Sequence, residues 1–284
     1  MGVQAPWLFA MSMGASVVGG LLGMAGGVFI VPAMTAAGID IRTAITASLV
    51  SVVASSCASA PPLLRRQLTN IRLAVVLELA TTLGAVSGVF LAGLLPTSAL
   101  FVLFAAVLVV SAKQMLARRA EATDTGPVPA GEWGTAFGLH STYVDPANGL
   151  EVSYQVRRVP LAMGLMYCAG VLSALLGIGS GVLKIPAMDT ALRLPLKVSS
   201  ATSNFMIGVT AAASACAFFV RGDIVPSIAG PVALGSVAGA VLGARLFIAV
   251  SSERLRLFFV FVLGLLAIQM LLQGFGVHLF GALR

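Results

Sequence analysis

Residues 19–34 read Gly19-Gly20-Leu21-Leu22-Gly23-Met24-Ala25-Gly26-Gly27-Val28-Phe29-Ile30-Val31-Pro32-Ala33-Met34, an apolar run broken by glycines. The chain carries a second version at residues 173–188, Ser173-Ala174-Leu175-Leu176-Gly177-Ile178-Gly179-Ser180-Gly181-Val182-Leu183-Lys184-Ile185-Pro186-Ala187-Met188. Matching positions are 154 residues apart, as from Gly27 to Gly181. Glycine breaks at corresponding positions of two apolar halves are typical of transporters, which build their substrate site from interrupted helices.

The composition places the chain in a lipid bilayer. Hydrophobic residues make up 58% and charged residues 10% of the 284 residues, and the mean hydropathy is +1.02. A soluble domain carries roughly 25% charged residues. Apolar runs long enough for a helical span, about 20 residues, occur at 73–95, 98–115, 160–176 and 256–272. They lack the alternation of a β-barrel, so we expect an all-α polytopic membrane protein.

The duplication extends through both apolar parts of the sequence. Further small residues match at separations of 154 or 151: Ala47-Ser48 with Ala201-Thr202, Gly84 with Gly235, and Gly88 with Gly239. The sequence therefore predicts two transmembrane repeats, residues 1–116 and 160–284. Each repeat is expected to be a glycine-broken helical hairpin followed by three transmembrane helices.

Residues 117–159 have a different character, because they are rich in charged residues and proline and hold no run long enough to span. We therefore expect an extramembrane connector. Within it, two alternating segments at 135–144 and 150–156 flank Asn148-Gly149, a dipeptide typical of hairpin turns. The sequence predicts a small β-hairpin, and it leaves open whether the connector regulates the two halves or only joins them.

The basic residues predict the orientation in the membrane. If each broken element returns to the side from which it enters, one side holds twelve Lys and Arg and the other holds three. The twelve are Arg65, Arg66, Arg72, Lys113, Arg118, Arg119, Arg157, Arg158, Arg193, Lys197, Arg254 and Arg256, and the three are Arg42, Arg221 and Arg284. Basic residues in short loops favour the cytoplasm. We therefore expect inverted repeats in a bacterial inner membrane, a cytoplasmic connector and periplasmic termini.

The two glycine-broken segments and the polar regions that follow them resemble the sulfite exporter TauE/SafE family, also called the toluene sulfonate uptake permease family. The resemblance lies in residues 22–32 with the polar region 46–49, and in the second copies of both at 176–186 and 201–204. It covers the whole membrane part. Ala25 and Ser180 stand where the family usually has glycine, and Lys184 replaces an apolar residue. The resemblance implies a carrier of sulfite or of organosulfonates such as sulfoacetate, usually an exporter.

Two sets of residues are candidates for binding such an anion, because a buried oxyanion needs donors that replace water. Helix amino termini offer free N–H groups and a positive dipole end, although the same glycines would also permit tight turns and close packing. The first set is therefore the two breaks: Gly23, Gly26, Gly27, Gly177, Gly179, Ser180 and Gly181. The second set supplies hydroxyl and amide donors after each break: Ser48, Thr202, Ser203 and Asn204.

Two ionisable residues in apolar spans are also functional candidates. Lys184 lies one turn after the second break, where it would neutralise the anion; an ion pair with Asp189 or a position at the membrane surface is the alternative. Glu78 is the candidate for proton coupling, with an ion pair to Arg72 as the alternative. Because only the second copy carries the lysine and Asn204, we expect substrate-specific chemistry mainly on that side.

Other functions are less favoured by the sequence. The basic residues do not cluster with aromatic residues, so we expect no nucleic-acid partner. Cys57, Cys168 and Cys216 lack paired spacing and histidine neighbours, so we interpret them as small buried residues and expect neither metal nor cofactor. Neither an ATP-binding loop nor a nucleophile with a base is present, which argues against an enzyme. The alternatives are an anion channel, a carrier that moves its substrate into the cell, and another small anion or organic acid as the substrate. The expected partners are the anion and membrane lipid, and a homodimer is left open.

Overall fold

The computed structural model describes residues 5–22, 26–65, 67–117, 133–144, 151–249 and 252–274. In chain order the elements are α1 (Ala5–Leu22), α2 (Gly27–Ala36), α3 (Ile41–Arg65), α4 (Ile71–Ala92), α5 (Thr97–Ala117), α6 (Trp133–Ala136), β1 (Ser141–Val144), β2 (Glu151–Tyr154), α7 (Val159–Leu176), α8 (Gly181–Ala187), η1 (Met188–Leu192), α9 (Leu196–Val220), α10 (Pro226–Ala249) and α11 (Ser252–Gly274). Among the described residues, five helices contain segments long and apolar enough to cross a membrane: Ile41–Pro61, Ile71–Ala92, Val159–Leu176, Lys197–Val220 and Pro226–Leu246. The chain is an all-α polytopic membrane protein, as the sequence predicts.

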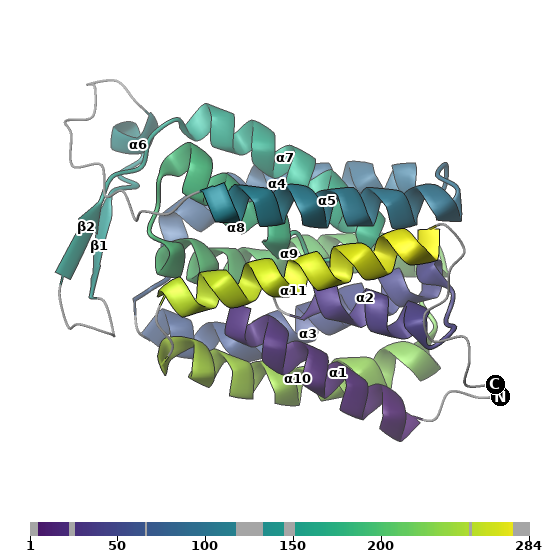
Figure 1. The fold of residues 1–284 in the computed structure, drawn as a ribbon. Helices are drawn as coiled ribbons and strands as arrows, with labels where there is room; N and C mark the ends of the chain where they lie inside the picture. The colour runs from purple at the N-terminus through teal and green to yellow at the C-terminus, as the bar shows by residue number, and fades with distance from the viewer. Residues whose placement is uncertain are drawn as a thin grey trace.

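The long helices lie side by side in one bundle, with α6, β1 and β2 at one end (Figure 1). We call this the connector end, and we call the opposite end, where α1 begins and α11 ends, the terminal end. The helix α1 packs along α10, and α7 packs along α4. The helix α3 contacts both α9 and α10, and α5 pairs with α11. Helices from the two halves of the chain are therefore interleaved, and neither half forms a bundle of its own.

Glycines bring two of these helix pairs into close contact. A Cβ on Gly84 or Gly88 of α4 would overlap a backbone carbonyl oxygen of α7, and a Cβ on Gly235 or Gly239 of α10 would overlap one of α1. The four oxygens belong, in that order, to Tyr167, Val171, Phe9 and Met13. In both pairs the later glycine faces the later oxygen, so the paired helices run parallel. Small residues at this spacing are typical of closely packed membrane helices.

Each glycine break turns the chain back inside the bundle. The helix α1 enters from the terminal end and α2 returns to that end, whereas α7 enters from the connector end and α8 with η1 returns there (Figure 1). The turns need left-handed backbone, with φ of 77° at Gly26 and 68° at Gly177, a conformation that glycine adopts without strain. The two broken elements thus open toward opposite ends of the bundle. Gly23 lies outside the described residues.

The segment after the second break is less regular than expected. The sequence predicts one helix over 182–192, but the structure divides this segment into the short helix α8 and the π-helix η1. Pro186 lies just before the change. Since proline has no N–H for the α-helical ladder and its ring crowds the preceding turn, a change of helix type beside it has a physical cause.

The connector contains the two expected strands, in shorter form. The strands β1 and β2 pair antiparallel, with Ser141 opposite Tyr154 and Val144 opposite Glu151. The expected turn at Asn148-Gly149 lies outside the described residues. Thr135 and Ala136, which the sequence analysis assigned to the first strand, belong instead to the helical turn α6. The alternation of polar and apolar residues there is too short to distinguish a strand from one turn of helix.

Asn70 connects this unit to the bundle. Asn70 caps α4 by accepting a hydrogen bond from the Leu73 N–H, at 3.1 Å. Its amide nitrogen donates to the carbonyl of Leu139 and to the hydroxyl of Tyr154. Burial raises the pKa of the Tyr154 phenol, and the hydrogen bond with Asn70 lowers it by less. Because burial has the larger effect, the phenol stays neutral. The connector is therefore held at the beginning of α4.

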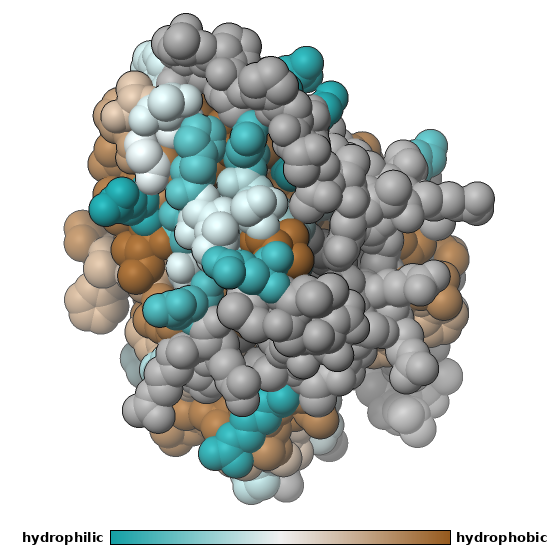
Figure 2. Space-filling model, turned by 90° about the vertical axis from the view of Figure 1, so that its left-hand side faces the viewer, coloured by the Kyte–Doolittle hydropathy of each residue, from teal (hydrophilic) through white to brown (hydrophobic). Residues whose placement is uncertain are grey.

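The outer surface matches a bilayer environment. Leu79, Leu83 and Phe90 of α4 are exposed on the flank of the bundle, whereas polar side chains gather at the connector end (Figure 2). The prediction that the three cysteines are buried is wrong: Cys57, Cys168 and Cys216 are free and exposed. The outer face of a membrane helix is as apolar as its inner face, so an apolar sequence neighbourhood does not indicate burial here.

Candidate functional site

The two glycine breaks meet at one serine in the middle of the bundle. The hydroxyl of Ser48, on α3, donates to the carbonyl of Gly177 at 2.8 Å and contacts the carbonyl of Gly27 at 3.3 Å. Ser48 is fully buried. A Cβ on Gly27 would lie 2.5 Å from a methyl carbon of Val52 and 3.1 Å from the Gly177 oxygen. Three predicted site residues, Gly27, Ser48 and Gly177, are therefore in direct contact.

The remaining break residues shape the backbone. Gly26 has its φ in the left-handed region beside Ser16 of α1, where a Cβ would lie 2.6 Å from the Ser16 hydroxyl. Gly179 and Ser180 have φ of 71° and 59°, and Gly181 begins α8. The hydroxyl of Ser180 donates to the carbonyl of Gly179 at 2.7 Å. The Ser180 side chain is thus engaged with its own backbone.

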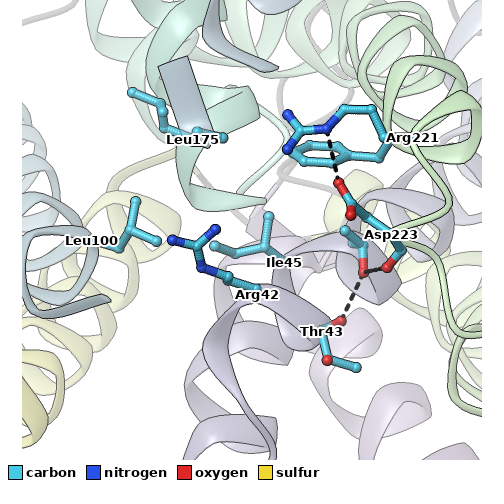
Figure 3. Close-up of a pocket in the computed structure, with 10 residues that line it drawn as sticks. Arg42, Thr43, Ile45, Leu100, Leu175, Arg221 and Asp223 are labelled. Carbon is cyan, nitrogen blue, oxygen red and sulfur yellow. Dashed lines mark hydrogen bonds and ion pairs between the residues drawn. The ribbon is translucent and has the colours of Figure 1, made fainter. Parts of the chain in front are cut away.

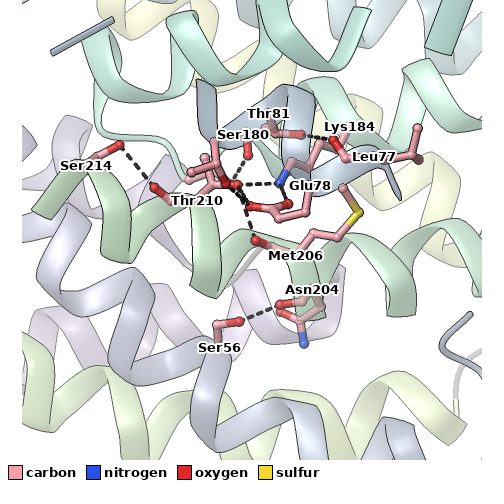
Figure 4. Close-up of polar contacts among 12 residues, drawn as sticks. Ser56, Leu77, Glu78, Thr81, Ser180, Lys184, Asn204, Met206, Thr210 and Ser214 are labelled. Atoms are coloured by element: carbon pink, nitrogen blue, oxygen red, sulfur yellow. Dashed lines mark hydrogen bonds and ion pairs between the residues drawn. The ribbon is translucent and has the colours of Figure 1, made fainter. Parts of the chain in front are cut away.

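Three side chains form a buried charged cluster. The ammonium of Lys184, on α8, donates to a carboxylate oxygen of Glu78 on α4 at 3.0 Å and to the hydroxyl of Thr210 on α9 at 2.7 Å. The Thr210 hydroxyl in turn donates to the other carboxylate oxygen of Glu78, to which Thr82 also donates. Figure 4 shows Lys184, Glu78 and Thr210 pointing toward one another. Lys184 is 0% exposed, so its charge is neutralised inside the bundle by Glu78.

The cluster corrects two of the pairings considered from the sequence. The acidic partner that the structure gives Lys184 is Glu78 and not Asp189. Glu78 accordingly pairs with Lys184 and not with Arg72, whose guanidinium lies 3.5 Å from the carbonyl of Gly138. Sequence proximity suggested both wrong partners, whereas the true partner lies 106 residues away. The alternative that Lys184 lies at the membrane surface is also wrong, because the side chain is fully buried.

One face of α9 continues from this cluster as a polar stripe. Ser199, Ser203 and Thr210 follow at intervals of four and seven residues, which places them on the same helix face. Within the described part of the chain, the buried hydroxyls of Ser199 and Ser203 have no hydrogen-bond partner. Thr210 was missed by the sequence analysis, although this spacing was the signal that could have found it.

Asn204 and Thr202 lie on other faces of α9. The amide nitrogen of Asn204 donates to the hydroxyl of Ser59 at 2.8 Å, while its amide oxygen is buried without a partner. The hydroxyl of Thr202 accepts a hydrogen bond from the Asn70 N–H at 3.1 Å. The structure therefore ties Thr202 to the α3–α4 loop and directs Asn204 toward α3, away from the charged cluster (Figure 4).

Comparison with known proteins identifies the family of the chain. A model of the sulfite exporter TauE/SafE family matches residues 8–270. The chain is a membrane transporter of the TauE/SafE family. It is also 24% identical over 277 residues to the "Probable membrane transporter protein YunE" of Bacillus subtilis (strain 168), covering 94% of this chain and 97% of that protein. No solved structure matches the chain.

In this TauE/SafE transporter the two breaks and the charged cluster belong to one connected core. The break at Gly177 leads through α8 to Lys184, and Lys184 is joined to α4 and α9. In the described residues, no group of three His, Cys, Asp or Glu side chains is placed to hold a metal ion. The groups that the described part of this core offers to a substrate are hydroxyls, amides, backbone N–H groups and the Lys184–Glu78 pair.

Proposed function

We propose that the chain is a secondary carrier that moves sulfite or a small organosulfonate, such as sulfoacetate, out of the cell across the bacterial inner membrane. The observation that carries this proposal is the α9 face on which two unpartnered buried hydroxyls, at Ser199 and Ser203, line up with the Lys184–Glu78–Thr210 cluster. Buried polar atoms without partners are rare in a folded protein. Buried hydroxyls without a partner also occur at Ser16, Ser111 and Ser173, but the two on α9 share a helix face with the charged cluster and would donate to a ligand.

The substrate would take its charge balance from Lys184 and its hydrogen bonds from α9. An anion that enters the bundle loses its hydration and needs both a positive charge and several donors. Ser199 and Ser203 offer hydroxyl donors, and Gly26, Gly27 and Gly179 let the two breaks pack closely against α1 and α3. Because Ser48 holds both breaks together, movement at one break would be transmitted to the other.

Proton coupling would follow from competition for Lys184. When Glu78 is ionised, its carboxylate neutralises the ammonium. When Glu78 takes up a proton, the ion pair is lost and the ammonium is available to the substrate anion. Release of the anion lets Glu78 lose its proton and pair with Lys184 again. One proton would then accompany each anion, so transport is electroneutral for a monoanion such as bisulfite and moves one net negative charge for a dianion such as sulfoacetate. For the monoanion, transport runs outward when the internal substrate gradient exceeds the opposing pH gradient.

The orientation and division of the chain belong to the same proposal. The helix ends that lie at the connector end carry or adjoin Arg72, Lys113, Arg157, Arg158, Arg193 and Lys197. Arg42 is at the start of α3 and Arg221 directly follows α9, and both of these helix ends lie at the terminal end. This imbalance favours a cytoplasmic connector, residues 117–159, between inverted repeats 1–116 and 160–284. Alternating access would then be a rocking of the interleaved halves around the central breaks.

Counterflow in proteoliposomes tests the carrier. Vesicles loaded with unlabelled sulfite should take up labelled sulfite transiently, with a rate that saturates as sulfite increases. Protein-free vesicles provide the leak control. Flux that rises in proportion to the gradient, without stimulation by internal sulfite, would reject the carrier in favour of an anion channel. Replacing sulfite by sulfoacetate, taurine, sulfate or a carboxylate in the same assay identifies the substrate class.

A further inference from the structure

A cavity of about 210 Å³ lies at the terminal end of the bundle, on the side away from the connector (Figure 3). It is lined by the beginning of α3, by the end of α9 and the loop that follows, and by side chains of α5 and α7. The residues that matter here are Arg42, Thr46, Leu100, Leu175, Arg221 and Asp223. None of them belongs to the charged cluster of Lys184.

The cavity carries two guanidinium groups and one carboxylate. Arg42 donates to the carbonyl of Leu95 at 3.0 Å, and Arg221 donates to the carbonyl of Val89 at 2.9 Å. Arg221 also pairs with Asp223 at 3.1 Å. A guanidinium has more N–H donors than these contacts use. The cavity therefore keeps a net positive charge and spare donors, and each planar guanidinium group can donate two hydrogen bonds to an oxyanion.

The Arg221 side chain is partly exposed but is held in place by its neighbours. The Arg221 guanidinium lies 5.6 Å from the ring centroid of Phe218, within the range of a cation–π contact. Thr46 donates to the backbone carbonyl of Asp223, at 3.3 Å, and so connects α3 to the loop after α9. In Figure 3 the guanidinium groups of Arg42 and Arg221 border the same open space.

The inner wall of the cavity reaches the second glycine break. Ile45 and Leu175 line the cavity, and a Cβ on Gly177 would lie 2.8 Å from the Cα of Ile45. One turn later on α3, Ser48 bonds to the Gly177 carbonyl. An anion in the cavity would thus be separated from the break contact of Gly27, Ser48 and Gly177 only by this thin wall.

We propose that this cavity is an oxyanion-binding vestibule, in which Arg42 and Arg221 bind the sulfonate or sulfite group at the outer mouth of the transport path. Leu100 and Leu175 would accept the short apolar body of an organosulfonate. Asp223 lowers the affinity by competing for Arg221, which permits release at this end. The role in transport rests on the proposed carrier function, but the binding of an anion to the two arginines does not.

Arginine modification tests the vestibule without any transport assay. Phenylglyoxal reacts with accessible guanidinium groups, and Arg42, Arg72 and Arg221 are all exposed. Sodium sulfate, a fully ionised probe, should slow modification of Arg42 and Arg221 about threefold once its concentration is about twice its dissociation constant. Arg72, at the connector end, is the internal control and should react at an unchanged rate. Sodium chloride at equal ionic strength should give no protection.

The Asp223→Asn variant distinguishes an anion site from a purely structural role of Arg221, which bonds to the Val89 carbonyl of α4. Removing the competing carboxylate should lower the half-protecting sulfate concentration severalfold, and the backbone bond from Thr46 is retained. Equal reactivity of Arg42 and Arg221 with and without sulfate would overturn the vestibule, as would a half-protecting concentration unchanged in Asp223→Asn. Protection without sulfite counterflow would reject the carrier and keep the anion site. Sulfite counterflow without protection of the two arginines would reject the anion site and keep the carrier.

Discussion

The ammonium nitrogen of Lys184 lies 3.0 Å from a carboxylate oxygen of Glu78, and the hydroxyl of Thr210 contacts both groups. The pair joins α8 of the second half of the chain to α4 of the first. A buried ion pair adds little net stability, because desolvation of both charges offsets their attraction. Folding alone therefore gives a weak reason for placing these charges in the bundle, and a role in transport gives a stronger one.

Removing one member of the pair should separate stability from transport. Lys184→Met leaves the Glu78 charge buried and unpaired, which costs about 3–5 kcal/mol of stability, so the variant should melt at a lower temperature. Lys184→Met/Glu78→Met should recover most of that loss, because two apolar side chains replace the pair. Both variants should lose sulfite counterflow. Thermal melting in detergent and counterflow in vesicles measure the two properties, and full counterflow by the double variant would assign the pair to folding only.

The carboxylate should determine the pH dependence. Uptake of a proton by Glu78 would free Lys184 for the anion, so the proposed coupling predicts a flux that depends on pH. In Glu78→Gln the side chain keeps hydrogen bonds to Thr82 and Thr210 but does not titrate. Flux through this variant should lose its pH dependence, and it should no longer carry protons into the vesicle lumen. A pH-sensitive dye inside the vesicles measures the protons, and an unchanged proton flux in Glu78→Gln would exclude Glu78 as the coupling group.

Ser203 should matter for the substrate more than for the fold. Its hydroxyl is buried without a partner, and an unsatisfied buried polar group costs about 1–3 kcal/mol. Ser203→Ala should therefore melt at the wild-type temperature or higher. Loss of a substrate hydrogen bond worth about 1.4 kcal/mol would raise the half-saturating sulfite concentration about tenfold. Ser87→Ala is the control, because Ser87 is half-buried and its hydroxyl has partners: it donates to the carbonyl of Leu83 and accepts from the Tyr167 hydroxyl. Equal half-saturation in the two variants would remove Ser203 from the site.

The sequence predicted the helical membrane fold and much of the core, because these depend on local composition and on the repeat. The glycine breaks, Ser48 and Lys184 were found in this way. The partner of Lys184 was not predicted, since proximity along the chain favours Asp189 and Arg72, whereas interleaving of the helices brings Glu78 to α8. The vestibule was not predicted either. In the sequence, Arg42 and Arg221 are basic residues of two separate loops, and only the fold brings them to one cavity.

The close contact between α4 and α7 should depend on the absence of a side chain at Gly84. A methyl group there would overlap the carbonyl oxygen of Tyr167, and overpacking of this kind costs about 1–3 kcal/mol. Gly84→Ala should lower the melting temperature. Gly164, on α7, has no atom within 4 Å of the place where its Cβ would lie, so Gly164→Ala should be neutral or slightly stabilising. Equal melting temperatures of Gly84→Ala and Gly164→Ala would contradict the close contact between α4 and α7.

The orientation can be tested at the two ends of the bundle. Cys57, Cys168 and Cys216 are free and exposed, so they must first be replaced by serine. In that background, Ser227→Cys places a thiol at the start of α10, at the terminal end, and Ser141→Cys places one on β1, at the connector end; both positions are exposed. Because basic residues favour the cytoplasm, a membrane-impermeant maleimide should label only residue 227 in intact cells, and residue 141 only after lysis. The opposite pattern would invert the proposed orientation and place the arginine vestibule on the cytoplasmic side.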